Sequence, residues 1–426
     1  MLDASSPLTI DASCARAQPP LRTLRPVRTT RKRLPIFMRE ALDPTPRYGG
    51  DLDRALASLH MPVLDGLRAL AAMAVVFYHF DEERFPIGGT GVLTFFVLSG
   101  FLITWLMCDE AERTGTISLR RFYARRSLRI FPAFYVYWLA ALGLAVLLHV
   151  QKGRPIPWGQ ATASFFYVCN YYQGLNHYPS SGFSHTWSLG VEEQFYLLWP
   201  AAFLVIARLA PIRRVVVTAG IVALFFAIRL TLHLIVGVPE EYVYTSFETR
   251  ADQLAVGCLL AVVLRSGAAA SVVRALATPA ATLVTFGLFV FSQYLSFTHG
   301  TDYRNAVGFS IEPALVATLI LQLFASHRRP WVRWLDSRPL RFLGRLSYSI
   351  YLYQQLVLHI LPRFVPKTLP WLGRLPISAG AVVLVAYASY RFVEQPFNRL
   401  KTRFAAPTTK ASTATESSPD ERRAVA

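Results

Sequence analysis

Residues 63–80 read VLDGLRALAAMAVVFYHF, and this stretch decides the fold class because it is apolar and long enough to cross a bilayer as a helix. It also carries Asp65, Arg68 and His79, which a simple membrane anchor does not need. A helix advances about 100° and 1.5 Å per residue, so His79 falls within roughly 20° of Arg68, about 16 Å further along the axis. Ionisable groups inside a membrane are costly and usually functional. This shared helix face is therefore the first candidate site.

The composition of the whole chain agrees with a membrane setting. Of the 426 residues, 53% are hydrophobic and 16% are charged, whereas about a quarter of the residues in a typical soluble domain are charged. Apolar runs of spanning length lie near 63–80, 89–107, 130–150, 187–207, 215–236, 250–264, 275–297, 308–326, 342–362 and 376–393. The shorter aromatic run 161–173 is expected to be re-entrant or interfacial. The sequence therefore predicts an all-α polytopic membrane helix bundle with about ten transmembrane helices.

The formal net charge of +18 could indicate nucleic acid, but the positions of the charges indicate membrane topology. Arginines gather in alternate loops, above all in residues 113–129 and 328–345, whereas residues 81–84 read DEER. Loops rich in Arg and Lys face the cytoplasm. We therefore expect both termini to be cytoplasmic, and we expect no nucleic-acid partner.

The ends of the chain differ in composition from the apolar middle. Residues 1–60 are predicted to be a disordered basic cytoplasmic tail, 61–398 the transmembrane domain, and 399–426 a second disordered tail. The basic run 28–33 either contacts anionic membrane lipid or is simply solvated. The four cysteines are far apart in the sequence, so they predict no metal site. The sequence gives no signal for an oligomeric state.

Two polar clusters interrupt the apolar runs near the middle of the chain. Arg126 and Arg129 are three residues apart and so are neighbours on a helix, an arrangement suited to phosphate but also explained by anchoring at the membrane surface. Glu192 and Glu193 follow Trp187-Ser188 at the start of the fourth apolar run. Adjacent residues point about 100° apart on a helix, so one carboxylate is expected to face the bundle.

Two further clusters have a structural and a functional explanation. Arg250 and Asp252 begin the sixth run and could be a plain intramembrane ion pair. Ser347 and Tyr348 begin the ninth run, where their hydroxyls could simply join helices by hydrogen bonds. We keep both explanations for each pair.

Taken together, the motifs resemble those of the acyltransferase-3 family of membrane proteins, which acylate bacterial polysaccharides, lipopolysaccharide O-antigens, nodulation factors and macrolides. The resemblance extends from about residue 64 to 397. The matching strings are LDGLR (64–68) followed by His79, FFVLSGFLIT (95–104), Arg126-x-x-Arg129-Ile130-x-Pro132, WSLGVEEQFY (187–196) and VEQPF (393–397). Five such strings in the order of the family make the resemblance specific.

The resemblance implies an O-acyltransferase of EC 2.3.1 type in the bacterial inner membrane. Such a protein binds no cofactor and takes an acyl group, commonly acetyl, from cytoplasmic acyl-CoA as co-substrate. It passes this group to a hydroxyl of a saccharide or lipid-linked sugar acceptor. The resemblance implies that His79 is the catalytic base with Arg68 as its motif partner, and that Arg126 and Arg129 bind the acyl donor.

One position departs from the family pattern. The family usually has a histidine where this sequence has Gln354. An amide is not a base near neutral pH, so a mechanism that needs a second histidine there is in doubt. His359 lies five residues further on and points about 140° away on the same helix.

These observations lead to a catalytic hypothesis. Coenzyme A phosphates dock at Arg126 and Arg129 beside Ser347 and Tyr348, the thioester passes Arg68, and His79 deprotonates the acceptor hydroxyl. Glu192 or Glu193 orients the imidazole or the acceptor, and Asp65, Trp187, Ser188, Arg250 and Asp252 support the site. A route through an acyl-histidine is the mechanistic alternative. The alternative function is a secondary transporter or export component, although the sequence has no matching broken-helix repeats.

Overall fold

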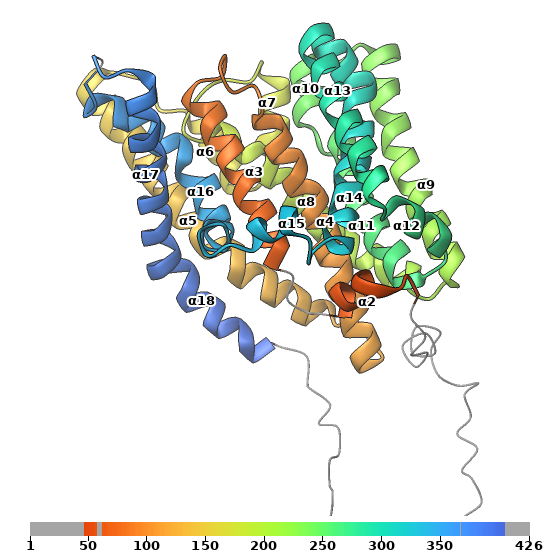
Figure 1. Cartoon of the computed structure of the whole chain (residues 1–426). Coiled ribbons are helices and arrows are strands. Elements are labelled where there is room, and N and C mark those ends of the chain that lie inside the picture. Colours follow the sequence, from red (N-terminus) through yellow and green to blue (C-terminus); the bar gives the residue numbers. More distant parts are fainter. Residues whose placement is uncertain (1–46, 58–61, 367, 405–426) are drawn as a thin grey trace, which may run out of the picture. The chain divides into compact units, whose positions relative to one another are not determined.

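The computed structural model describes residues 47–57, 62–366 and 368–404, all of which belong to one compact unit (residues 35–426). Throughout these ranges the regular elements are helices (Figure 1). The first half contains α2 (Gly50–Ala57), α3 (Pro62–Phe80), α4 (Gly88–Thr114), α5 (Leu119–Lys152), α6 (Trp158–Phe165), α7 (Cys169–Leu175), η2 (Ser184–Thr186), α8 (Trp187–Ile206), α9 (Pro211–Leu230) and η3 (Thr231–Val236). The second half contains α10 (Glu240–Thr245), α11 (Phe247–Ser266), α12 (Ala270–Leu276), α13 (Pro279–Tyr303), η4 (Arg304–Gly308), α14 (Phe309–Ala325), α15 (Pro330–Arg333), η5 (Trp334–Asp336), α16 (Arg338–Ile360), η6 (Leu361–Arg363), α17 (Trp371–Ser389), η7 (Tyr390–Glu394), α18 (Gln395–Leu400) and η8 (Lys401–Phe404).

Within the described residues, 7 helical segments are long and apolar enough to cross a membrane, or up to 8 if one bent pair is a single span. They are Pro62–Phe80, Gly88–Thr114, Leu119–Lys152, Ser184–Ile206, Pro211–Val236, Pro279–Ala325 and Trp371–Leu400, and the bent pair is Glu240–Ser266 with Ala270–Leu276. The predicted all-helical membrane bundle is therefore confirmed, but the count of about ten spans is not.

The lower number of spans is partly explained by predicted runs that pair into one segment or are not apolar enough to count. The segment Pro279–Ala325 is a hairpin, because the Ser292 hydroxyl on α13 donates to Glu312 on α14 at 3.0 Å, and Gln322 donates to Thr285 at 3.0 Å. Helix α16 is not among the apolar segments because it carries several polar side chains, yet it packs along α3 in the bundle. The run 161–173 forms parts of α6 and α7, each too short to cross a bilayer.

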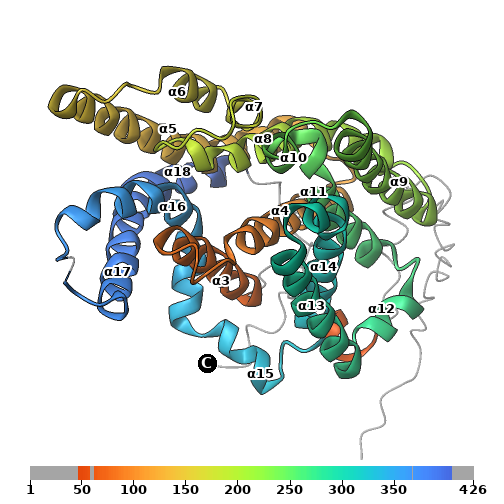
Figure 2. The ribbon, with the colours of Figure 1, turned by 90° about the horizontal axis from the view of Figure 1, so that it is seen from above.

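Glycines let two pairs of helices approach closely. A Cβ on Gly344 of α16 would lie 2.0 Å from the carbonyl oxygen of Asp65 on α3, and a Cβ on Gly100 of α4 would lie 1.9 Å from the carbonyl oxygen of Leu254 on α11. Small residues at such crossings let membrane helices pack by van der Waals contact. Figure 2 shows α3 in the middle of the bundle, with α16 and α17 on one side and α4, α11 and α14 on the other.

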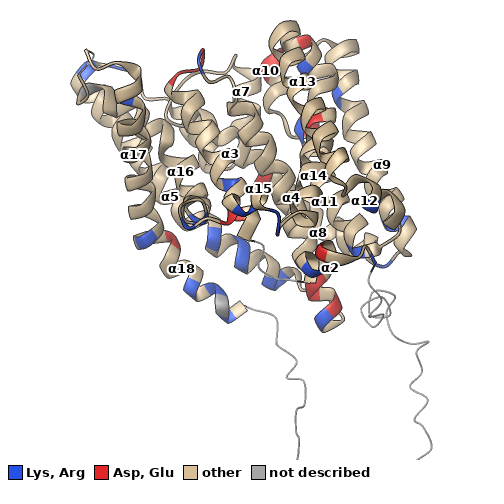
Figure 3. Cartoon of the chain, viewed as in Figure 1, with Lys and Arg blue, Asp and Glu red and all other residues tan. Residues whose placement is uncertain are grey.

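Positive side chains gather at one end of the bundle, which we call the basic end and define by residues 119–129 and 395–404 (Figure 3). Helix α5 begins there with Ser118 as its cap, whose hydroxyl accepts the amide of Arg121 at 3.4 Å. Within the predicted tails, residues 50–57 form α2 and 399–404 belong to α18 and η8, whereas 1–46 and 405–426 lie outside the described residues.

Candidate active site

A cavity of about 450 Å³ lies among α3, α4, α5, α8, α16 and η8. The sequence-predicted residues that line it are Asp65, Arg68, Arg126, Arg129, Ser188, Glu192, Glu193, Ser347 and Tyr348. Four separate helices, α3, α5, α8 and α16, supply them, so the fold brings together motifs that are far apart in the sequence. Lys401 of η8 lines the cavity at the basic end.

Three arginines give the cavity its positive character. Arg68 and Arg126 interact electrostatically with each other and with Glu192, and Arg129 interacts with both arginines. Together with Lys401 these arginines make four cations in the cavity lining, against the three carboxylates of Asp65, Glu192 and Glu193, so one positive charge is left in excess. Because guanidinium groups bind phosphate in bidentate fashion, this arrangement suits a ligand with several phosphate oxygens.

Neighbouring side chains hold these charged groups in place. The guanidinium of Arg126 lies 3.7 Å from the ring centre of Tyr196, a stacked cation–π contact. The Ser99 hydroxyl donates to Glu192 at 2.9 Å, and the Tyr348 hydroxyl donates to the backbone carbonyl of Ile130 at 3.1 Å. The charged residues are therefore ordered before any ligand binds.

Side chains of α16 and α8 meet in the wall of the cavity. Tyr351 and Ser188 both line the cavity, and their hydroxyls share a hydrogen bond. The Tyr351 hydroxyl also donates to the backbone carbonyl of His185 at 2.9 Å.

His79 is not among the residues that line the cavity. Its Nδ1 lies 2.9 Å from the backbone oxygen of Val75, so Nδ1 is the donor nitrogen and Nε2 keeps its lone pair. The cavity reaches Val92, whose neighbour Gly91 packs on Ala71 and Val75 of α3. Of α3, only Leu64, Asp65 and Arg68 line the cavity, so His79 lies further along the helix than the part that faces it.

The structure also gives the surroundings of Arg250 and Asp252. Asp252 accepts a hydrogen bond from Arg229 of α9 at 2.6 Å, and both side chains are buried. The close ion-pair partner of Asp252 therefore comes from α9, while Arg250 interacts with Asp252 only electrostatically, without a close ion pair among the described residues. Arg250 instead lies 3.8 Å from the ring centre of Phe309 and 5.6 Å from that of Trp187. These residues form a buried cluster beside the cavity.

The structure also shows the surroundings of Gln354, where the sequence departs from the family pattern. Gln354 is fully buried, and its amide atoms have no hydrogen-bond partner among the described residues. His359, which the sequence places about 140° from it, interacts electrostatically with His79 because α16 packs along α3. His185 interacts with His79 as well. The end of α3 that carries His79 therefore has two imidazoles nearby, from other segments of the chain, and the phase of a single helix could not reveal them.

The sequence analysis missed four residues that the structure places at the cavity or against its charges. Ser99 and Tyr196 were inside the quoted strings, and so was Glu394, which interacts with Arg129 and Arg68. Their position in those strings was a signal, but no chemistry of their own pointed to a role. The fourth, Lys401, was assigned to a tail because its surroundings are polar.

The fold and the cavity define a multi-pass helical membrane protein with a basic intramembrane cavity suited to a phosphorylated ligand. Residues 61–391 match the family model described as an acyltransferase domain, and the chain belongs to this family, the acyltransferase-3 type. This match confirms the resemblance to the acyltransferase-3 family that the sequence motifs indicated. It does not favour the alternative function of a transporter.

Curated relatives of the chain are O-acetyltransferases. The peptidoglycan O-acetyltransferase OatA of Listeria monocytogenes is 31% identical over 356 residues, which are 80% of this chain and 56% of the relative. The O-acetyltransferase OatA of Staphylococcus aureus is 28% identical over 365 residues, which are 82% of this chain and 59% of the relative. The chain thus spans less than two thirds of the length of these relatives. No solved structure matches it significantly.

Proposed function

We propose that this chain moves an acyl group, most simply acetyl, from cytoplasmic acyl-CoA to a hydroxyl of a saccharide or lipid-linked sugar on the outer side of the membrane. The observation that carries the proposal is the cavity in which Arg68, Arg126 and Arg129 meet at the basic end of the bundle. Arginine-rich ends face the cytoplasm, where acyl-CoA is made. The proposal places the protein in the bacterial inner membrane with both termini cytoplasmic.

The donor would enter from the basic end. Its phosphates would bind Arg126 and Arg129, with Ser347 and Tyr348 beside them, and the pantetheine arm would extend past Arg68. The positive charge that the carboxylates leave unbalanced supports this orientation, because the phosphates would neutralise it. No bound cofactor is needed for this step.

The transfer itself would use His79 as a general base. The lone pair of Nε2 takes the proton of the acceptor hydroxyl while that oxygen attacks the thioester carbonyl. The carbon–sulfur bond breaks, and the departing thiolate receives the proton. A positioned base of this kind contributes about 10² to 10⁴ in rate. The free Nε2 that follows from the Val75 contact supports this role.

His79 does not line the cavity, so the thioester would have to move beyond the cavity lining to reach the imidazole. The alternative route, through an acyl-histidine, stays open. A labelled acyl-enzyme trapped in wild type but not in His79→Ala supports that route, and its absence under rapid quench counts against it.

The acceptor follows from chemistry and from the relatives. The relative from Listeria monocytogenes is named for O-acetylation of peptidoglycan, and a sugar supplies the hydroxyl that the general-base step requires. The test is the O-acetyl content of cell-envelope polysaccharide in a deletion strain complemented with wild type or with His79→Ala. We expect restoration by wild type alone. Equal restoration by His79→Ala refutes the role of the histidine.

A further inference from the structure

The end of the described chain forms part of the cavity wall. Lys401 of η8 lines the cavity together with Arg68, Arg126 and Arg129. Among the residues that the structure describes (47–57, 62–366 and 368–404), none forms an ion pair or a hydrogen bond with the side chain of Lys401. Its charge lies near those of Arg125, Arg126 and Arg129, all of the same sign. Cations held this close are unfavourable unless an anion joins them.

We propose that Lys401 is an additional phosphate-binding residue for the acyl donor, positioned by the docking of η8 on α5. The proposal rests on the proposed function and extends it to a segment outside the matched family domain, which ends at residue 391. Lysine binds phosphate as a point charge, so it complements the forked arginines on α5.

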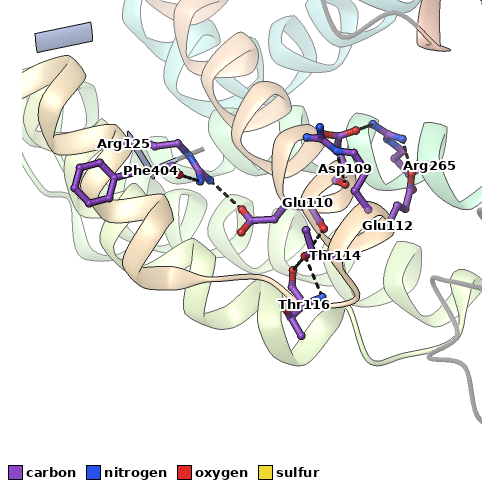
Figure 4. Close-up of polar contacts among 9 residues, drawn as sticks. Asp109, Glu110, Glu112, Thr114, Thr116, Arg125, Arg265 and Phe404 are labelled. Atoms are coloured by element: carbon purple, nitrogen blue, oxygen red, sulfur yellow. Dashed lines mark hydrogen bonds and ion pairs between the residues drawn. The ribbon is translucent and has the colours of Figure 1, made fainter. Parts of the chain in front are cut away.

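A polar network fixes the position of η8 (Figure 4). Arg125 donates to the backbone carbonyl of Phe404 at 3.0 Å and to Glu110 at 2.9 Å. The second oxygen of Glu110 accepts the backbone amide of Ser118, the cap of α5, at 3.3 Å. Arg125 therefore ties η8 to α4 and α5, and Lys401 lies three residues before the anchored carbonyl. In this arrangement Arg125 and Glu110 are positioning residues.

The same surroundings give Lys401 a distinctive pH dependence. Burial lowers the pKa of Lys401 to about 8, and the charges of Arg129, Arg126 and Arg125 add to this effect. Its ammonium is therefore charged below about pH 8 and loses its charge above it, whereas arginines stay charged throughout. The other charged groups that face the cavity are Arg68, Asp65, Glu192 and Glu193, and Arg399 lies on the preceding helix α18.

The test measures binding of S-ethyl-CoA, a thioether that cannot transfer its ethyl group, by calorimetry on the purified full chain in lipid-free detergent. At about pH 7 we expect Lys401→Gln to weaken binding about tenfold. The matched control is Arg403→Gln, which removes the same charge from an exposed side chain of η8 and should stay within about twofold of wild type. Thermal unfolding of each variant checks that it folds.

The pH dependence of S-ethyl-CoA binding supplies a second, independent test of the role of Lys401. Binding by wild type should weaken between about pH 7 and about pH 9, and Lys401→Arg should remove this weakening because arginine keeps its charge. If Lys401→Gln binds as tightly as wild type and Lys401→Arg titrates like wild type, the inference is wrong while the proposed function stands. If wild type itself does not bind S-ethyl-CoA, the proposed function fails.

Discussion

Replacing Gly344 with alanine is expected to push α3 and α16 apart beside the cavity. The added Cβ would lie 2.0 Å from the carbonyl oxygen of Asp65, whereas ordinary contacts begin at 3.4 Å, so the helices must separate by about 1.4 Å. The opposing atom is backbone and cannot rotate away. Overpacking of this kind costs typically about 1–3 kcal/mol. Because Ser347 and Tyr348 follow on the same helix, the cavity should widen and bind the donor more weakly.

The assay is thermal unfolding of the purified protein in detergent, followed by S-ethyl-CoA binding below the unfolding temperature. The control is Gly380→Ala on α17, where a Cβ meets nothing within 4 Å. Alanine there should leave stability unchanged or raise it slightly, because glycine costs a helix interior about 0.5–1 kcal/mol relative to alanine. If Gly344→Ala unfolds at the wild-type temperature and binds the donor equally well, the close approach of α3 and α16 does not shape the cavity.

Three further substitutions test the packing around the charged groups. Tyr196→Leu should weaken donor binding about two- to tenfold by removing the ring under Arg126, whereas Tyr196→Phe should bind like wild type in the same titration. Ser99→Ala should lower the rate of acyl transfer about tenfold, since Glu192 loses a hydrogen-bond donor, and an unchanged rate would show that this carboxylate needs no orientation. Arg229→Ala should destabilise the fold by about 3–5 kcal/mol by leaving a buried carboxylate of α11 unpaired, and a normal yield of folded protein in size-exclusion chromatography would contradict this.

The sequence predicts the parts of the fold that depend on local apolar length. The first span was expected at 63–80 and is observed as Pro62–Phe80, because a run of this length and composition has no other stable state in a membrane. Arg126 and Arg129 were likewise expected to be neighbours on one helix, and both line the cavity. Local periodicity was sufficient for each.

The remaining features depend on contacts between distant segments. Helical phase places His79 on the face of Arg68, but it cannot show that Arg68 lines the cavity whereas His79 does not. The composition around Lys401 resembles a solvated tail, and only the anchoring of Phe404 by Arg125 gives that segment a fixed position.

The partner of Asp252 shows the same limit in the membrane interior. Arg229 stands 23 residues earlier in the sequence, on another helix, and its apolar surroundings gave no sign of a pairing. A buried charge requires a partner, but nothing in the sequence alone distinguishes Arg229 from Arg250.

The central claim is that a basic cavity holding acyl-CoA and a histidine beyond its end together carry out acyl transfer. The most direct measurement is the release of labelled acetyl from acetyl-CoA, to water or to a saccharide acceptor, by purified protein in detergent. We predict turnover by wild type and its loss in both Arg68→Ala and His79→Ala, with each variant still folded. Turnover that is unchanged in either folded variant would contradict the account.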